Sequence, residues 1–440
     1  MQQHISDSAR RIEGRTVHRM LHNTLAVLAL ASTAACNSLL SVDNPGRVPT
    51  SALSDPALAP TLDASALGAF ECAFANYIVT AGTLTQEYIT SNSFVDSNIW
   101  GWRGTETRTA PGSCPGTRTA TSMGFYSPMQ QARFQAEDAV TRISAFTDDQ
   151  VPGRVNMLAE LSAYEGYALT LLGEGMCQMT VDNGPLMSRA DTWKLALTKF
   201  ADALKYAGQT NNADITNMAH VGRARTYLDL ADLTNAAADA ILVPANYVRV
   251  SEYSESTPAR ENRVYNMTVR NDFLSVGPAY RNLTVGGKAD PRVKVVDAGR
   301  NGQDQVTRQW TQQKYTGSGA ATINLASYIE AQLIYAEAVA GTNAQAAKDA
   351  INRVRAIAGV SPLDGSEGSD LTAVVLEERR RQLFSEGTRL GDMLRKGIPF
   401  PSGVNFKNQL FGPMSCVPLP DVEMQNNPNL QGKTASYTPQ

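Results

Sequence analysis

The chain has 440 residues and a formal net charge of −3, and 42% of its residues are hydrophobic. This length and composition allow a full hydrophobic core in one or two lobes, and they exclude global disorder. The near-neutral charge balance gives no strong field for a polyanion, so nucleic-acid binding is not expected.

The first 35 residues have the pattern of a secretory signal peptide. A basic flank precedes an apolar run from Leu25 to Ala31, which is too short for a membrane-spanning helix, and small residues follow as far as Cys36. A cysteine at this place resembles a bacterial lipobox, in which cleavage leaves a lipid-modified N-terminal cysteine, although Thr33 stands where Leu is usual. The alternative is an ordinary cleavage site beside an unrelated cysteine. Translation starts at Met1 or Met20.

Five cysteines are present: Cys36, Cys72, Cys114, Cys177 and Cys416. A lipid on Cys36 leaves an even four, which favours disulfides in an oxidising compartment. Four cysteines allow three connectivities, and the sequence does not choose among them. The turn-rich flanks of Cys114, "APGSCPGT", would let it reach Cys72. The alternative is a set of isolated buried thiols.

Apolar residues recur at three- and four-residue spacing around 125–243 and 322–397, which predicts amphipathic helices in pairs. In the second region the stripe ends at Gly341, Asn343 can cap the next helix, and Gly359 ends it. This pair is about as long as a tetratricopeptide repeat of about 34 residues. The sequence therefore predicts a mainly α fold with a tetratricopeptide-like helical repeat scaffold.

Long polar and β-like tracts interrupt the helical regions around 76–124, 244–319 and 398–440. Loops of this length in a globular protein usually have a function, because binding residues favour loops that a rigid scaffold positions. We expect these tracts to carry binding residues.

The segment Leu376–Gly397, "LEERRRQLFSEGTRLGDMLRKG", combines charges of both signs with an apolar stripe at seven-residue spacing. The stripe indicates one helical face that packs inward. Opposite charges follow at three-residue spacing: Glu386, Arg389, Asp392 and Arg395. A site for an anionic ligand would leave cations unneutralised, whereas here each cation has an acid in reach. We therefore expect a structural charge lattice rather than a binding site.

The same segment closely resembles the C-terminal signature of the SusD/RagB family of nutrient-binding outer-membrane lipoproteins. Gln382 replaces a usual Glu of that signature, and Lys396 replaces a common aromatic residue. The resemblance extends, in order, to "CNSLLSVDNPGRV", "ASYIEAQLIYAEAVA" and "CVPLPDVEMQNNPNL".

This resemblance implies one nutrient-binding domain over residues 36–440, with a tetratricopeptide-like scaffold and a loop-rich second lobe. It implies a protein held at the outer membrane, facing the cell exterior, by acyl chains such as palmitate on Cys36. Its expected partners are an oligosaccharide or peptide ligand and a SusC-like TonB-dependent transporter barrel. No bond is broken in this role, so neither a cofactor nor a metal is expected.

The stretch "FVDSNIWGWRG" is the first candidate for the ligand site. A glycan site needs flat aromatic rings for sugar faces, and amides and carboxylates for hydroxyl groups. This stretch supplies that mixture: Asp96, Asn98, Trp100, Trp102 and Arg103. The alternative is that one or both tryptophans fill the interface between the lobes.

A second candidate is the pair Trp310 and Tyr315 in "RQWTQQKYTG", for which a core position is favoured.

An enzyme is not expected. Three of the four histidines precede Cys36, which leaves His220, and no GxSxG, HExxH or phosphate-loop motif occurs. A tetratricopeptide adaptor for protein partners is a further alternative, but it would not need long loops rich in aromatic residues.

Overall fold

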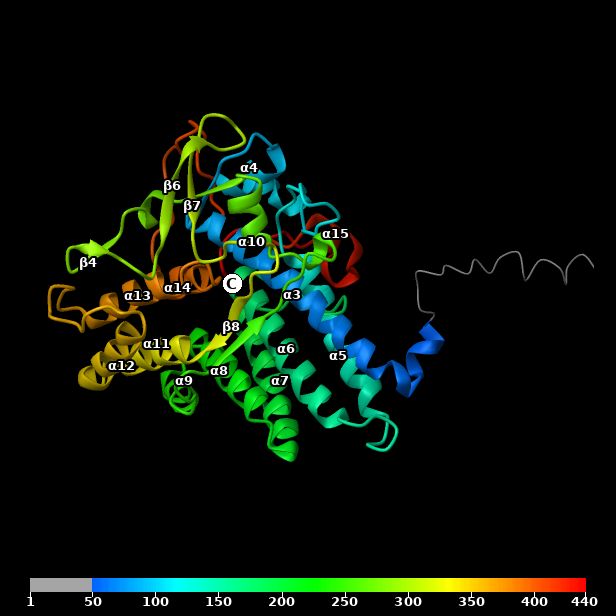
Figure 1. Cartoon of the computed structure of the whole chain (residues 1–440). Coiled ribbons are helices and arrows are strands. Elements are labelled where there is room, and N and C mark those ends of the chain that lie inside the picture. Colours follow the sequence, from blue (N-terminus) through cyan, green and yellow to red (C-terminus); the bar gives the residue numbers. More distant parts are fainter. Residues whose placement is uncertain (1–49) are drawn as a thin grey trace, which may run out of the picture. The chain divides into compact units, whose positions relative to one another are not determined.

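Helix α3 (Ala59–Leu84) runs through the centre of the fold (Figure 1). Every residue from Phe70 to Leu84 is buried, because α5 (Tyr126–Ser144), α6 (Arg154–Gly175) and several shorter elements pack against it. A helix that is covered on all sides has no solvent-facing polar stripe, and this part of α3 is predominantly apolar.

The chain continues from α6 into three further helices that pack on one another in sequence order: α7 (Arg189–Thr210), α8 (Ala213–Asp229) and α9 (Leu233–Ala240). Phe200 of α7 is fully buried between α6 and α8. A β-carbon at Gly222 would overlap the ring of Phe200, so the glycine permits this close approach. The side chain of Asn212 then caps α8 by accepting a hydrogen bond from the Ile215 N–H at 3.1 Å.

A second helical region contains α11 (Tyr328–Val339), α12 (Ala344–Ile357), α13 (Leu371–Gln382) and α14 (Arg389–Lys396). The Asn343 side chain caps α12, as the sequence predicts, through a 3.1 Å bond from the Ala346 N–H. The predicted mainly α fold with a tetratricopeptide-like helical scaffold is confirmed.

The remaining elements are short. The strands form four antiparallel pairs in the described residues: β1 (Tyr88–Thr90) with β3 (Leu274–Val276), β2 (Val248–Ser251) with β8 (Ile323–Ser327), β4 (Thr284–Val285) with β5 (Lys288–Ala289), and β6 (Val295–Asn301) with β7 (Arg308–Gln312). The short helices are α4 (Val95–Gly101), α10 (Arg263–Tyr265) and α15 (Asp421–Asn426), the 3₁₀ turns η1 (Thr50–Ser54), η2 (Pro56–Leu58), η3 (Thr105–Thr109), η4 (Pro258–Arg260), η6 (Pro278–Tyr280) and η7 (Pro428–Leu430), and the π-helical turn η5 (Asn266–Arg270).

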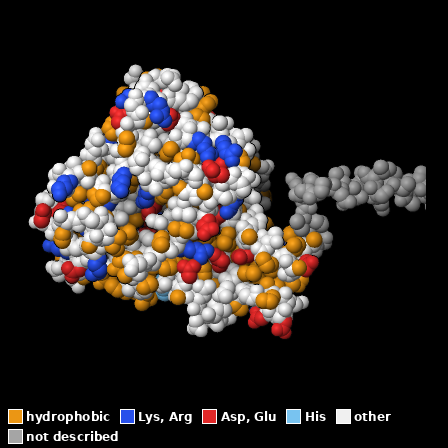
Figure 2. Space-filling view, in the orientation of Figure 1, with side chains coloured by type: hydrophobic (Ala, Val, Ile, Leu, Met, Phe, Trp, Pro, Cys, Tyr) orange, Lys and Arg blue, Asp and Glu red, His pale blue; other side chains and the backbone are white. Residues whose placement is uncertain are grey.

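The computed structural model describes residues 50–440, of which Asp55–Gln440 form one unit. The predicted signal peptide, 1–35, and Cys36 lie outside the described residues. Within the unit, α4 and the β6–β7 hairpin lie at one end and α7 to α9 at the other (Figure 1). Basic and acidic side chains lie interspersed over the face in Figure 2, without a large patch of one sign.

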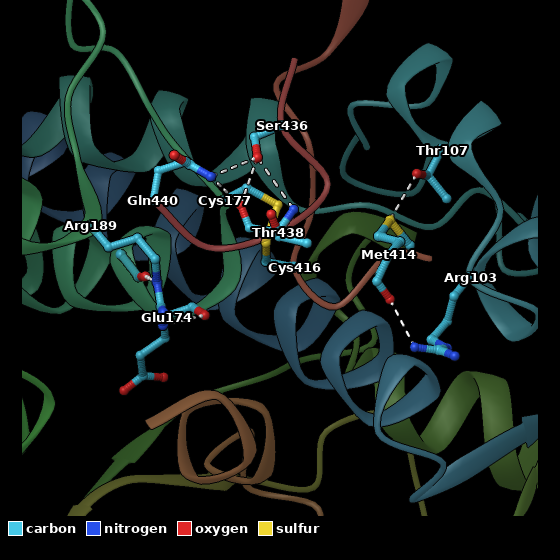
Figure 3. The surroundings of a disulfide bond; sticks show 11 residues. Arg103, Thr107, Glu174, Cys177, Arg189, Met414, Cys416, Ser436, Thr438 and Gln440 are labelled. Carbon is cyan, nitrogen blue, oxygen red and sulfur yellow. Dashed lines mark hydrogen bonds between the residues drawn. A yellow bond between two sulfur atoms is a disulfide. The ribbon is translucent and has the colours of Figure 1, made fainter. Parts of the chain in front are cut away.

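Two disulfides pair the four cysteines that the sequence left open. Cys72 of α3 is bonded to Cys114, and Cys177, just after α6, is bonded to Cys416. The second bond holds the C-terminal segment against the helical scaffold, where the Gln440 N–H also donates to the Cys177 carbonyl at 3.1 Å (Figure 3).

The predicted loop-rich tract 76–124 differs from the structure at its start. Residues 76–84 are the last turns of α3, and 95–101 form α4. A search for amphipathic stripes misses this part of α3, because its residues are buried on every side and present no polar face.

The segment Leu376–Gly397 forms two helices rather than one. Helix α13 ends at Gln382 and α14 begins at Arg389; between them Ser385 and Gly387 have positive φ of 65° and 82°. Helical spacing therefore does not extend from Leu383 across to Leu390.

The break changes the expected charge pairs. Asp392 and Arg395, both within α14, are 2.7 Å apart as predicted. Glu386 lies before the helix and pairs with Lys314 at 2.6 Å instead. Among residues 50–440, no ion pair within 4.0 Å involves Arg389, so its two predicted pairs are wrong.

Arg379 supplies the cation that Arg389 was expected to supply. It is 2% exposed, and its Nε and Nη2 donate to the Asp392 carboxylate at 3.0 and 2.8 Å. Arg395 also bonds Glu337 of α11. The lattice thus joins α11, α13 and α14 through buried charges, in keeping with a scaffold role.

We predict that Arg379→Ala lowers the free energy of unfolding by about 3–5 kcal/mol, because it leaves Asp392 buried without its main partner. Arg389→Ala removes the same charge from a half-buried position and should cost at most about 1 kcal/mol. Urea unfolding of both variants measures the difference. Equal losses would contradict the assignment of the lattice to Arg379.

A second prediction concerns Glu87, whose side chain is buried beside Ser385. Burial raises the pKa of Glu87 from 4.5 to about 7, although the Ser385 N–H and the charges of Arg389 and Lys314 act to lower it. The unfolded chain therefore releases this proton first as pH rises from 4.5, which favours unfolding until the folded protein also ionises near pH 7.

Glu87→Gln should remove this part of the pH dependence, because an amide has no proton to release. From pH 4.5 to 8, the wild-type unfolding free energy should fall by about 3 kcal/mol relative to the variant. Urea unfolding at several pH values checks this, and parallel pH profiles for the two proteins would show that Glu87 ionises normally when folded.

Candidate functional site

Helix α4 contains most of the first candidate stretch, and polar side chains fix how it begins. The Asn98 Nδ2 donates to the carbonyls of Asn92 and Phe94 at 2.9 and 2.8 Å. Asp96 accepts hydrogen bonds from the Ser97 N–H and the Thr121 hydroxyl, both at 2.9 Å. Asp96 and Asn98 thus hold the helix in place, and Asn98 also contributes to a cavity beside it.

The two tryptophans of the stretch point in different directions. Residues two apart in a helix differ by about 200° around its axis. Trp100 is fully buried in the main hydrophobic core, whereas Trp102, at the C-terminal cap of α4, is half-buried and lines the cavity. Trp100 is therefore a core residue, which agrees with the alternative interpretation for one of the two tryptophans.

Arg103 is buried and holds a neighbouring loop rather than facing the cavity. Its Nη1 donates to the Met414 carbonyl at 3.0 Å (Figure 3), and its Nη2 donates to the carbonyl of Pro401. The guanidinium lies 5.4 and 5.2 Å from the ring centres of Phe400 and Phe411. Burial lowers the pKa of this arginine.

The loop that Arg103 holds is also bonded to the end of α4. The Gly412 N–H donates to the Trp102 carbonyl at 2.7 Å, and a β-carbon at Gly412 would overlap the Arg103 carbonyl. This close approach places the exposed ring of Phe406 beside the same cavity as Trp102.

The cavity has a volume of about 530 Å³ and opens to solvent between α4, the turn before β7 and the C-terminal loop. It combines two aromatic rings with hydroxyl, amide and charged groups and two valines. Its lining residues are Asn92, Ser93, Val95, Asn98, Trp102, Asp304, Val306, Phe406, Lys407, Asn408 and Gln409.

A larger cavity of about 760 Å³ lies between the β4–β5 hairpin and α13, but it is a weaker candidate. No aromatic side chain lines it in the described chain. The buried cations that line it, Arg292 and Arg355, are already paired with carboxylates such as Glu378. A ligand there would find no aromatic stacking surface, and the buried cations of the cavity are already neutralised.

The second sequence candidate does not form a joint site. Tyr315 is buried, and its hydroxyl donates to the Ser385 carbonyl at 3.1 Å. Trp310 is half-buried on β7, with the guanidinium of Arg281 5.2 Å from its ring centre. Both residues pack in or against the main core, as the sequence analysis favoured.

Sequence reasoning thus found Trp102 and Asn98 but missed Asp304, Phe406 and Lys407. The segment "NFKNQLFG" has the same mixture of aromatic and amide residues as the first stretch. That composition is the signal that would have found Phe406 and Lys407. Asp304 carries no such signal, because only the fold brings it to the cavity.

Within residues 50–440, no group of three His, Cys, Asp or Glu side chains is arranged to hold a metal ion. None of the helices in that range is both long and apolar enough to cross a lipid bilayer.

Comparison with known proteins finds that the SusD family model matches residues 205–435. A search of the curated proteins gives no match. Solved structures with the same fold include a laminarin-binding SusD-like protein (15% identity, TM-score 0.60, 86% of this chain and 98% of that one). A SusD-like carbohydrate-binding protein from Bacteroides vulgatus has 15% identity and a TM-score of 0.62, and the match covers 88% of this chain and 98% of that one.

Surface glycan-binding protein A from Bacteroides thetaiotaomicron is similar over 83% of this chain and 96% of its own, with 12% identity and a TM-score of 0.62. At these identities the structures establish the fold, and the family match covers more than half of the sequence. The chain therefore belongs to the SusD family.

Proposed function

We propose that this protein binds an oligosaccharide in the 530 Å³ cavity beside α4 and delivers it, unaltered, to a TonB-dependent transporter in the outer membrane. The observation that carries the proposal is the pair of aromatic side chains, Trp102 and Phe406, on one solvent-open cavity that is also lined by amides.

Aromatic rings and amides together suit a sugar. The faces of Trp102 and Phe406 offer flat apolar surface to the C–H face of a pyranose ring. The amides of Asn408 and Gln409 and the hydroxyl of Ser93 can donate to and accept from sugar hydroxyls. The similar laminarin-binding, carbohydrate-binding and glycan-binding proteins support this ligand class.

Binding without turnover fits the same residues. A binding protein has to match the ground state of its ligand, and nothing in that task requires a nucleophile or a proton donor. The cavity lining contains one carboxylate, Asp304, so it lacks the second carboxyl group that most glycoside hydrolases use.

The cellular role rests on the family and on the N-terminal sequence. A lipid on Cys36 would anchor the protein, and the chain that follows Cys36 would tether the described unit to the membrane surface. The unit would then cover a SusC-like barrel, close over it with bound ligand and pass the ligand on.

To test the ligand site, purified protein is screened against neutral and acidic oligosaccharides and oligopeptides, and hits are measured by calorimetry. Trp102→Ala and Phe406→Ala should each weaken oligosaccharide binding about fivefold, because each removes a stacking contact of about 1 kcal/mol. Their melting temperatures should stay near that of the wild type.

Phe134→Ala is the matched control, since Phe134 is an exposed phenylalanine of α5 that does not line the cavity. It should leave affinity unchanged. Wild-type affinity in both Trp102→Ala and Phe406→Ala would move the site elsewhere, and a hit among oligopeptides alone would change the ligand class.

To test the anchor, Cys36→Ser is compared with wild type in membrane fractionation and intact-mass measurement. Wild-type protein extracted from membranes should begin at Cys36 and carry acyl chains, and Cys36→Ser should leave the membrane fraction, because the acyl chains supply the anchoring free energy. Ser41→Ala, five residues on, should stay membrane-bound. An unmodified wild-type N-terminus at another residue would contradict lipidation.

A further inference from the structure

Two ionisable side chains, Asp304 and Lys407, are present among the residues that line the 530 Å³ cavity. They form an ion pair, with 2.8 Å between the Lys407 Nζ and the Asp304 Oδ2. The side chain of Lys407 is only 15% exposed, and that of Asp304 only 5%. The pair thus contributes no net charge to the cavity.

The ammonium group of Lys407 is also saturated with acceptors. Besides Asp304, it donates to the Asn92 carbonyl at 2.8 Å and to the Asn98 Oδ1 at 3.1 Å. An ammonium group has three N–H donors, and three protein acceptors occupy them. An anionic ligand would therefore find a lysine at the cavity, but none of its N–H groups would be free to donate a hydrogen bond to the ligand.

The carboxylate of Asp304 is held in place by its own turn. Its Oδ1 accepts from the N–H groups of Val306 and Thr307 at 2.9 and 2.8 Å, and its Oδ2 accepts from the Thr307 hydroxyl at 2.6 Å. Burial acts to raise the pKa of Asp304, but the hydrogen bonds from Lys407 and Thr307 outweigh it and lower the pKa below 3.8. The neutralising charge is thus present at all physiological pH values.

We propose that this cavity selects neutral saccharides over acidic ones, and that Asp304 determines this specificity by neutralising Lys407 and occupying one of its donors. This inference rests on the proposed function, since it assigns the ligand class of the same site. A uronate or sulfate group in the cavity would meet the fixed Asp304 carboxylate and no free cation. No attraction would then offset the free-energy cost of removing the anion from water.

Asp304→Asn tests the inference with little change of shape. The amide oxygen can still accept the Val306 and Thr307 N–H bonds, whereas the charge on Lys407 loses its counter-ion. Lys407→Met leaves the Asp304 carboxylate without its counter-ion, and the double variant again has no net charge at this pair. Asp297→Asn makes the same charge change at the exposed Asp297–Arg308 pair of the β6–β7 hairpin, outside the cavity lining.

The probes are matched pairs of oligosaccharides of equal length: gluco-oligosaccharides with oligoglucuronates, galacto-oligosaccharides with oligogalacturonates, and manno-oligosaccharides with oligomannuronates. Calorimetry with wild type should detect the neutral member of at least one pair. Asp304→Asn should raise affinity for the corresponding uronate about tenfold, or about 1.4 kcal/mol, because the charge of Lys407 is no longer neutralised. High salt should remove this gain.

Lys407→Met, the double variant and Asp297→Asn should show no such gain, and melting curves confirm that each variant is folded. The inference is overturned if wild type binds a uronate as tightly as its neutral partner, or if Asp304→Asn leaves their ratio unchanged. Those results leave oligosaccharide binding itself intact. Failure of every pair to bind wild type would overturn both this inference and the proposed function.

Discussion

The arrangement of the helices depends on buried guanidinium–carboxylate pairs that join one helix to another. Arg379 of α13 meets Asp392 of α14, and Arg225 of α8 meets Glu174 of α6 at 2.7 Å. Each of these side chains is less than 5% exposed. A buried charge without its partner costs several kcal/mol, so the helices are fixed relative to one another to within the tolerance of these bonds.

The candidate site is built on this scaffold through a small number of long-range contacts. Arg103 fastens the C-terminal loop to the end of α4, and Lys407 returns from that loop to the carbonyl of Asn92. The Cys177–Cys416 bond fixes the same C-terminal segment to the end of α6. These contacts hold the rings of Trp102 and Phe406 at one opening, as a stacking surface requires.

Local signals in the sequence predicted those parts of the fold that local interactions determine. Asn343 caps α12 as its position before an apolar stripe indicates, and Asp392 pairs with Arg395 one turn away. The later part of the central helix α3 was missed because it is buried on all sides from Phe70 to Leu84. The break near Ser385 was missed because a positive φ leaves no mark in apolar spacing. The cavity could be predicted only in part: Trp102 stood out by composition, whereas its meeting with Asp304 and Lys407 depends on tertiary contacts.

The distribution of perturbed carboxyl groups separates scaffold from site. Burial raises the pKa of Glu87 and of Glu330 to about 7, and both are buried in the fold and do not line the cavity. The carboxyl group at the cavity, Asp304, is shifted in the opposite direction and is bound by four donors. A general acid needs a proton to give near neutral pH, and a group with a lowered pKa has none. In the proposed function, the cavity would therefore hold its ligand by shape, stacking and neutral hydrogen bonds, while carboxyl groups with raised pKa values, such as Glu87, affect the stability of the fold.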